Sequence, residues 1–178
     1  METACNLVLV GPMGAGKTSI GKRLAEALGL RFVDADRELE QRTGASIARI
    51  FDCEGEAGFR VRESALLVEL LATPGLVIAT GGGVVLDPAN RERLRRDAFA
   101  IHLHASVGEQ LRRLARCRQR PLLQRPDRET VLQEMAELRT PLYGEVARLR
   151  VETDGTTPAQ ACRALLPRLR QHGREHAA

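Results

Sequence analysis

Tryptophan is absent from this chain of 178 residues, and aromatic side chains make up only 3% of it. Aliphatic side chains and alanine must therefore fill the core, which a chain of this length can bury without disulfides or metals. The shortage of aromatic rings also argues against a stacking platform for single-stranded nucleic acid. The apolar share of 43% and the charged share of 28% are ordinary for a globular protein, and we expect one domain over residues 1–178.

The cysteines are few and scattered: Cys5, Cys53, Cys117 and Cys162 form no C-x-x-C pair. This spacing matches neither a disulfide framework nor a zinc site, and it is typical of a reducing compartment. Long apolar runs are missing too, so no segment has the length of a membrane span. The first residues lack the basic start and apolar core of a signal peptide. We expect a cytoplasmic monomer with no membrane partner.

Lysine is scarce, because Lys17 and Lys22 are the only two in a chain with a net charge of +4. Nearly all cations are arginines. Such a basic balance is compatible with nucleic-acid binding. It is equally compatible with an active site that grips phosphates and a small anion, for which the guanidinium fork is well suited. Because acidic residues are interspersed and no basic tail is present, the pattern favours a small anion, and we expect no nucleic-acid partner.

What the chain does contain is a complete phosphate-binding motif. Gly11–Ser19 has the pattern G-x-x-x-x-G-K-[ST] between an apolar run at 7–10 and helical spacing at 20–28. Small residues let backbone N–H groups converge on phosphate oxygens, and the helix N-terminus adds unsatisfied donors. Lys17 would bridge the β- and γ-phosphates, and Thr18 would ligate Mg²⁺. We assign nucleotide binding to Gly14, Ala15, Gly16, Lys17, Thr18 and Ser19; the alternative is a glycine-rich turn that binds nothing.

Strand and helix patterns alternate along the chain, which predicts an α/β fold with a parallel sheet covered on both faces. Helix caps are predicted at Ser46, Asp87, Ser106, Asp127 and Thr157. Pro141 should interrupt or kink its helix. Short strands are expected at 6–10, 30–33, 76–80, 98–103 and 149–151. Helices are expected at 17–28, 37–42, 47–51, 57–71, 88–96, 107–116, 127–140 and 158–171, with a frayed tail at 172–178.

Polar and glycine residues follow the second and third expected strands. Asp34 and Asp36 stand where open α/β sheets bind ligands, and in strand geometry both would point toward the phosphate loop. Alternatively, the two acids cap the next helix. Gly81, Gly82 and Gly83 end the third strand, which indicates close approach of a ligand to bare N–H groups; a flexible loop is the alternative.

An arginine-rich stretch at about 115–126 carries two prolines between helices. It is either a solvated basic loop or a mobile lid that closes on the phosphates. Triphosphate binding alone is compatible with a motor ATPase, a GTPase or a small-molecule kinase. The chain has no guanine-reading N-K-x-D motif, and its third strand ends in glycines rather than in the acidic residues of a motor ATPase. A compact chain with such a lid suits phosphoryl transfer to a bound acceptor.

These residues together resemble one family, shikimate kinase. The resemblance rests on an ordered set that covers nearly the whole chain from residue 7 to about 158. It implies a three-layer α/β/α P-loop kinase fold like that of nucleoside monophosphate kinases, with a five-stranded parallel sheet and a lid. It also implies an enzyme that phosphorylates the 3-hydroxyl of shikimate with ATP, on the route to chorismate and aromatic amino acids. The carriers are Gly11–Thr18, Asp34-Ala-Asp36, Phe59-Arg60, Gly81–Gly83, Arg120–Leu123 and Arg139–Tyr143.

The resemblance also implies roles. Asp36 would accept hydrogen bonds from the shikimate hydroxyls and take up the proton or only orient the hydroxyl. Asp34 would hold Mg²⁺ through water, and Arg60 and Arg139 would grip the substrate carboxylate. The implied catalytic residues are Lys17, Asp36 and Arg120; the substrate-binding residues are Asp36, Arg60, Gly81, Gly82, Gly83 and Arg139; and the nucleotide-binding residues outside the loop are Arg113, near adenine, and Arg120, the lid arginine.

One position departs from the family pattern. Where some relatives carry an arginine against the nucleotide, this chain has Thr156-Thr157 before Pro158, so adenine contact there would involve the backbone only. From the residues alone, a polyhydroxylated anionic acceptor is indicated, but not which one. A gluconate kinase or another small-acid kinase of this fold stays an alternative, as does a catalytically silent protein that binds an anionic metabolite or a partner protein.

Overall fold

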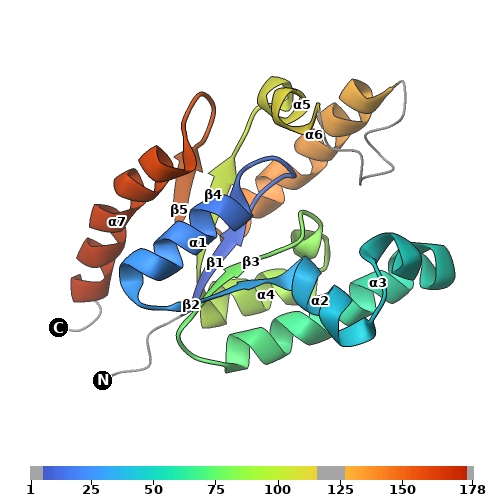
Figure 1. The fold of residues 1–178 in the computed structure, drawn as a ribbon, viewed down its shortest axis with the longest axis horizontal. Helices are drawn as coiled ribbons and strands as arrows, with labels where there is room; N and C mark the ends of the chain where they lie inside the picture. Colours follow the sequence, from blue (N-terminus) through green and yellow to red (C-terminus); the bar gives the residue numbers. More distant parts are fainter. Residues whose placement is uncertain (1–5, 116–126, 176–178) are drawn as a thin grey trace.

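Strands and helices alternate along the chain in the computed structural model, which describes residues 6–115 and 127–175. Their order puts a helix after each of the first strands, as the sequence pattern predicts (Figure 1). The elements are β1 (Asn6–Val10), α1 (Lys17–Leu28), β2 (Arg31–Asp34), α2 (Ala35–Thr43), α3 (Ile47–Ala72), β3 (Leu76–Ala79), the 3₁₀ turn η1 (Val84–Leu86), α4 (Pro88–Asp97), β4 (Ala98–His104), α5 (Val107–Leu114), α6 (Arg128–Val146), β5 (Leu149–Glu152) and α7 (Pro158–Glu175).

The strands form one five-stranded sheet in the order β2-β3-β1-β4-β5, and every pairing is parallel. This confirms the predicted parallel sheet. The central strand is β1, where Val8 lies opposite Ile78 of β3 on one side and Ala100 of β4 on the other. Because ligands of open α/β sheets bind beyond the carboxyl ends of the strands, the glycine-rich loop leaves the sheet at its centre and on its functional edge.

Helices cover both faces of the sheet, and successive residues of β1 show which helices cover which face. Leu7 and Leu9 pack in a cluster with side chains of α1 and α7. Val8 and Val10 pack in a second cluster with side chains of α3, α4 and α6. Figure 1 shows α1 and α7 side by side, with α3 apart from both. The three-layer α/β/α arrangement is therefore confirmed, and both clusters consist mainly of aliphatic side chains, as the composition predicts.

Four of the five predicted side-chain caps are present. The prediction for Asp127 is wrong, because this residue is the N-cap of α6 but its side chain makes no capping hydrogen bond. Ser46 accepts a hydrogen bond from the Arg49 N–H at 3.2 Å, and Asp87 accepts one from the Ala89 N–H at 2.7 Å. Ser106 accepts from the Glu109 N–H at 3.2 Å. At the start of α7 the capping box is reciprocal, because the Thr157 N–H donates to the Gln160 side chain and the Gln160 N–H donates to Thr157 Oγ1. These side chains satisfy N–H groups that have no partner within their helices.

Three predicted helix boundaries are wrong. Pro141 does not interrupt α6, which continues to Val146. Pro141 removes one helical N–H, but Tyr143 and Val146 beyond it are buried in the core and hold the next turn in place. The last helix extends to Glu175, past the expected start of a frayed tail. Conversely, α5 ends at Leu114 rather than at about 116.

The predicted break between 51 and 57 is reduced to one residue. Residues 47–72 form a single bent element, α3, in which only Gly55 leaves helical geometry, with φ 70° and ψ −176°.

No described helix combines the length and the apolar character needed to cross a bilayer. The expected lid spans about 115–126; Ala115 follows α5, and residues 116–126 lie outside the described residues, as does the chain end at 176–178.

Candidate active site

The last residue of the phosphate loop before α1 is a glycine, which provides no side-chain cap for the first turn of this helix. This residue, Gly16, occupies the N-cap position with φ 89°. Gly14 also has positive φ, at 79°. Glycine adopts these angles without strain, so the loop can present successive N–H groups to an anion. The assigned residues Gly14, Ala15, Gly16, Lys17, Thr18 and Ser19 all lie in this loop or in the first turn of α1.

Lys17 folds back over the loop. Its Nζ donates to the carbonyl oxygens of Gly11 at 2.7 Å and Pro12 at 2.8 Å. The ammonium group is thus held beside the loop by weak carbonyl partners, which a phosphate can replace with a charge-assisted contact.

Thr18 and Asp34 join the loop to the end of β2. The Thr18 hydroxyl donates to Asp34 Oδ2 at 2.7 Å. The other oxygen of Asp34 accepts from the Arg37 N–H at 3.4 Å, so Asp34 also caps α2. The helix cap that the sequence offered as an alternative is thus present at Asp34, although its second oxygen faces the phosphate loop. Two hard oxygen donors lie together at this point, as Mg²⁺ sites require.

Asp36 does not continue the strand, and the expectation that it points the same way as Asp34 by strand alternation is wrong. The strand ends at Asp34, and Asp36 lies in the first turn of α2, because the Asp34 cap starts the helix immediately. The Asp36 carboxylate instead approaches Gly81: a β-carbon on Gly81 would lie 3.0 Å from Asp36 Oδ1. The side chain thus reaches the glycine triplet from the neighbouring strand end.

Each glycine of the triplet lies against a predicted acceptor-binding side chain. Gly81 faces Asp36, and a β-carbon on Gly82 would lie 3.7 Å from Arg139 Nη1 and 3.5 Å from the Gly11 carbonyl oxygen. A β-carbon on Gly83 would lie 2.5 Å from the Arg60 guanidinium carbon. A side chain at Gly81 or Gly83 would therefore overlap Glu63 or Arg60, whereas a β-carbon on Gly82 would make ordinary van der Waals contacts. The triplet is closely packed by polar side chains, which agrees better with a ligand-binding segment than with a flexible loop.

Glu63 is a residue of this site that was not predicted from the sequence. Arg60 Nη1 donates to Glu63 at 2.6 Å, and Arg60 Nη2 contacts Glu56 at 3.0 Å. The other oxygen of Glu63, Oε1, is buried with no hydrogen-bond partner among the described residues, and a β-carbon on Gly81 would lie 2.5 Å from it. Burial raises the pKa of Glu63, while Arg60 opposes that shift.

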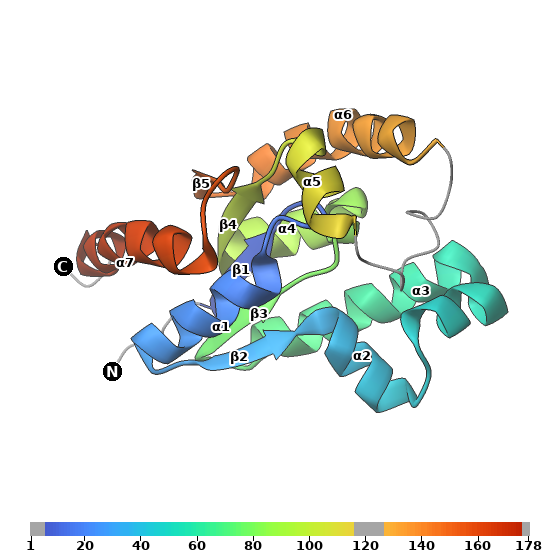
Figure 2. The same ribbon diagram turned by 45° about the horizontal axis from the view of Figure 1, so that its top comes forward.

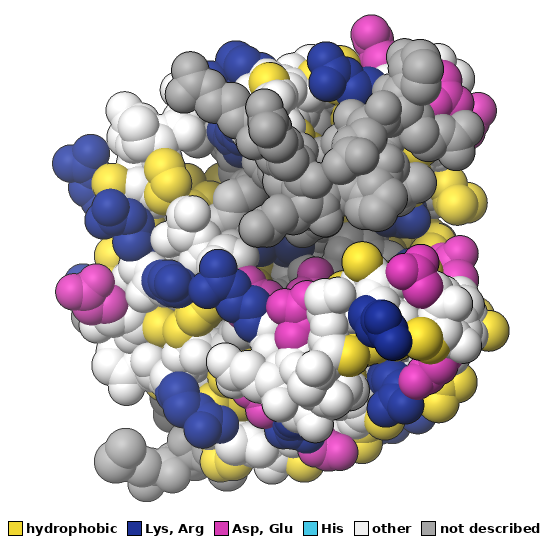
Figure 3. Space-filling view, turned by 45° about the vertical axis from the view of Figure 1, so that its right-hand side comes forward, with side chains coloured by type: hydrophobic (Ala, Val, Ile, Leu, Met, Phe, Trp, Pro, Cys, Tyr) yellow, Lys and Arg dark blue, Asp and Glu magenta, His cyan; other side chains and the backbone are white. Residues whose placement is uncertain are grey.

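A signal for Glu63 is present in the sequence. Its position falls on the apolar stripe of α3, between the buried side chains of Phe59 and Leu66. A charged residue within such a stripe is buried only when it is paired. Figure 3 shows acidic and basic side chains adjoining on the face of the molecule that carries α2 and α3.

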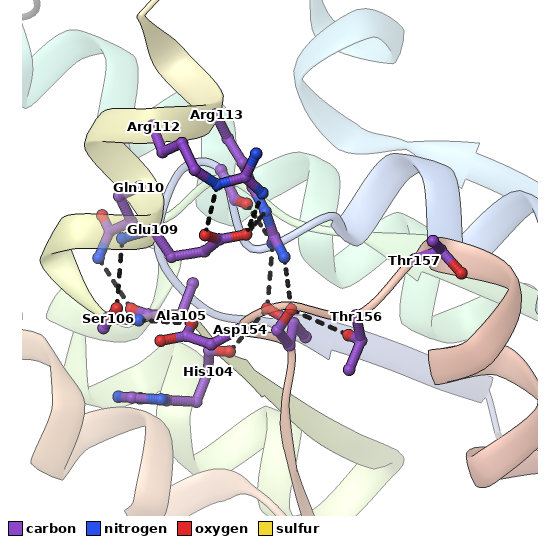
Figure 4. A network of polar contacts seen from close by, with 12 residues as sticks. His104, Ala105, Ser106, Glu109, Gln110, Arg112, Arg113, Asp154, Thr156 and Thr157 are labelled. Atoms are coloured by element: carbon purple, nitrogen blue, oxygen red, sulfur yellow. Dashed lines mark hydrogen bonds and ion pairs between the residues drawn. The ribbon is translucent and has the colours of Figure 1, made fainter.

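Arg113 connects three separate segments (Figure 4). Its Nη1 donates to the Gly14 carbonyl at 2.8 Å and to Thr153 Oγ1 at 3.1 Å, and its Nε contacts Glu109 at 2.6 Å. Arg112 also binds Glu109. Together the two arginines lower the pKa of the Glu109 carboxyl to about 2, and Arg112 has the larger effect. The N–H groups of the Arg113 guanidinium are thus bound to protein groups, which leaves its planar face as the surface on which an adenine ring could stack.

The threonines at the departure from the family pattern are engaged locally. Thr156 Oγ1 donates to the Thr153 carbonyl at 2.9 Å, and Thr157 caps α7 (Figure 4). Neither hydroxyl needs a nucleotide as partner. Arg120, the expected lid arginine, lies outside the described residues. Among the residues described, no cluster of three or more histidine, cysteine or carboxylate side chains could hold a metal by itself.

Comparisons with known proteins agree with this geometry. The family model for shikimate kinase matches residues 13–170. A shikimate kinase of Xanthomonas campestris pv. campestris is 56% identical over 169 residues, covering 95% of this chain and 94% of its own length. One of Pseudomonas paraeruginosa is 55% identical over 166 residues, covering 93% of this chain and 96% of its own length.

Solved structures show the same similarity. Shikimate kinase from Acinetobacter baumannii in complex with shikimate superposes with a TM-score of 0.92 at 44% identity, covering 96% of each chain. A gluconokinase from Sinorhizobium meliloti superposes with a TM-score of 0.65 at 20% identity, covering 100% of each chain, which shows a shared fold only.

Proposed function

The chain belongs to the shikimate kinase family, and we propose that it transfers the γ-phosphate of ATP to the 3-hydroxyl group of shikimate, giving shikimate 3-phosphate and ADP. One observation carries this proposal. Gly82 lies against both Arg139 and the Gly11 carbonyl of the phosphate loop, while its neighbours lie against Asp36 and Arg60. The groups that we assign to the carboxylate and the hydroxyl of the acceptor therefore adjoin the loop that we assign to the nucleotide phosphates.

On the donor side, the loop N–H groups from Gly14 to Ser19 would hold the nucleotide phosphates. Lys17 would exchange its two carbonyl partners for the β- and γ-phosphate oxygens and stabilise charge on the transferring group. Arg113 would present its planar face to the adenine. Arg120 would add positive charge from the lid, as the family resemblance implies.

The Thr18 hydroxyl and the Asp34 carboxylate fit Mg²⁺, because both are oxygen donors and lie 2.7 Å apart. Thr18 would ligate the ion directly and Asp34 through water. When bound, Mg²⁺ neutralises charge on the phosphate oxygens during transfer.

On the acceptor side, Arg60 and Arg139 would bind the carboxylate of shikimate, and Asp36 would accept a hydrogen bond from the hydroxyl that is phosphorylated. Arg60 is already paired with Glu56 and Glu63. These carboxylates hold its guanidinium in place, so the substrate carboxylate meets a positioned donor rather than a mobile side chain. The N–H groups of Gly81–Gly83 would complete the pocket.

We also propose that the enzyme works as a monomer in the cytoplasm. Scattered cysteines support a reducing compartment, and Cys53 and Cys162 are free thiols in the described part of the chain.

The decisive experiment measures ADP release from ATP and Mg²⁺ with shikimate and with gluconate as separate acceptors. We expect turnover with shikimate and none with gluconate. Turnover with gluconate alone would replace the proposal with gluconate kinase. Asp36→Ala is the matched variant: because it removes the hydroxyl acceptor, it should lose most of the activity, and a variant as active as the parent would contradict the assigned role.

A further inference from the structure

Tyr143 lies beneath the acceptor pocket and reaches it with one atom. The side chain is 1% exposed and belongs to the core cluster on the α3–α4–α6 face of the sheet. Its ring packs against the ring of buried His102 from β4, with the centroids 5.0 Å apart. Packing fixes the ring between α6 and the sheet, so the hydroxyl is the part of the side chain that faces the glycine triplet.

The hydroxyl contacts two groups of the predicted acceptor pocket. It donates to the Gly82 carbonyl oxygen at 2.5 Å. Arg139 lies one helical turn earlier on α6, and its positive charge opposes the rise in the pKa of the hydroxyl that burial causes. The three groups converge, because a β-carbon on Gly82 would lie 3.6 Å from the Tyr143 hydroxyl and 3.7 Å from Arg139 Nη1.

This arrangement makes the hydroxyl a fixed donor. Burial raises the pKa of Tyr143 to about 12, so the proton stays on the oxygen at any physiological pH. A hydroxyl can donate one hydrogen bond and accept others. Here it donates to the Gly82 carbonyl oxygen, which leaves its lone pairs for the neighbouring guanidinium of Arg139, whose Nε is buried without a hydrogen-bond partner among the described residues.

We propose that Tyr143 is a positioning residue for the acceptor, which it serves by tying the Gly82 peptide to the Arg139 guanidinium before the acceptor binds. This inference rests on the proposed function, because it assumes that Arg139 and the triplet bind the acceptor. A pocket whose donors are held in place loses less conformational entropy on binding. Without the hydroxyl, the Gly82 peptide and Arg139 each have to be ordered by the substrate itself.

The test is Tyr143→Phe, which keeps the ring and removes only the hydroxyl. We expect the KM for shikimate to rise about fivefold to twentyfold, the range of one or two lost hydrogen bonds, with the KM for ATP within about twofold of the parent. In an Arg139→Ala background the same change should have a smaller effect than in the parent, because the two side chains act through one contact.

Val146→Ala is the matched control. Val146 is buried in the same cluster on the same helix, and its aliphatic side chain cannot form a hydrogen bond with the triplet. It should lower the Tm and leave the KM for shikimate unchanged. An unchanged shikimate KM in Tyr143→Phe would overturn the inference while leaving the proposed function intact. Absence of shikimate turnover in the parent would instead reject the proposed function.

A second measurement needs no variant, because Tyr143 is the only tyrosine of the chain. Tyrosine labelled with ¹³C at Cζ therefore gives a single NMR signal. We expect shikimate to change the chemical shift of this signal in a saturable manner. A non-hydrolysable ATP analogue with Mg²⁺ should cause a much smaller change in chemical shift. If the chemical shift stayed the same at shikimate concentrations that support turnover, the result would contradict the inference.

Discussion

Arg139 illustrates how one side chain depends on its surroundings. Its guanidinium lies against Gly82 and Tyr143, and its Nε has no hydrogen-bond partner among the described residues. Under the proposed function, removing the arginine would leave the carboxylate of the substrate without one of its cationic partners. Such a loss costs about 2–4 kcal/mol, or about thirtyfold to a thousandfold in affinity.

We therefore expect Arg139→Ala to raise the shikimate KM by at least about thirtyfold, with little change in the KM for ATP. Steady-state kinetics with each substrate varied in turn measures both. Arg148→Ala is the control, since Arg148 is an exposed arginine just before β5, and its guanidinium donates to the Arg95 carbonyl of α4 at 3.4 Å. An unchanged shikimate KM in Arg139→Ala would remove this arginine from the acceptor pocket.

His102 gives a prediction about pH. It is 1% exposed, and burial lowers its pKa from 6.5 to about 4, with Arg150 and His104 adding to the shift. Between these values the unfolded chain binds more protons at this residue than the folded chain. The stability from His102 is therefore complete above about pH 6.5 and is lost as the pH falls toward 4.

Urea unfolding at pH 7 and pH 4.5 measures this loss in the parent and in His102→Phe, which keeps an aromatic ring and cannot titrate. We expect the parent to lose about 2 kcal/mol more unfolding free energy than the variant over this range. Other titrating groups are common to both proteins and cancel. Equal losses would mean that the pKa of His102 is the same in the folded and the unfolded chain, so that burial does not lower it.

At the scale of elements, the strands and the capped helix starts could be predicted because their signals are local. Apolar runs of four or five residues mark β1 and β3, and a serine or aspartate precedes α3, α4 and α5. The end of α6 could not be predicted in this way. Whether Pro141 stops a helix depends on what the next turn contacts, and Tyr143 contacts His102 and Gly82, which are far away in the sequence.

The candidate site divides along the same line. The phosphate loop, the acids after β2 and the glycine triplet could be identified from their spacing, and the structure places them together. Their roles stay predictions. Glu63 and the hydroxyl of Tyr143 could not be assigned from spacing, because their importance comes from contacts with Arg60, Gly81 and Gly82 across the fold.

The bend in α3 gives a prediction for this element. Gly55 has φ 70° and ψ −176°, a conformation that is nearly exclusive to glycine, and a β-carbon there would meet no atom within 4 Å. Gly55→Ala should therefore destabilise the fold through backbone strain alone, by about 1–3 kcal/mol.

Gly144→Ala is the matched comparison, because this glycine lies inside α6 at a negative φ, with equally open space around its β-carbon position. It should stabilise the fold by about 0.5–1 kcal/mol. Denaturant unfolding of both variants and the parent measures the change in the free energy of unfolding, which should be a decrease for Gly55→Ala and an increase for Gly144→Ala. Stabilisation by Gly55→Ala would mean that α3 straightens at no cost.

At the scale of the whole molecule, the proposed site has two halves on one sheet edge: the loop of α1 and the groups of α2, α3, α6 and the glycine triplet (Figure 2). Each ligand should stabilise the folded chain independently. A ligand at a hundred times its Kd adds about 2.7 kcal/mol, which raises the Tm of a domain of this size by about 5–10 °C.

This linkage separates the halves by thermal denaturation. Arg139→Ala should lose the Tm shift caused by shikimate and keep the shift caused by Mg²⁺ with a non-hydrolysable ATP analogue. Lys17→Ala should show the reverse, because we assign its ammonium group to the nucleotide phosphates and not to the acceptor. Lys22→Ala, at an exposed position on α1, should keep both shifts. If Lys17→Ala and Arg139→Ala each lost both shifts, the two halves would form one cooperative site, and the assignment of one residue to each ligand would be wrong.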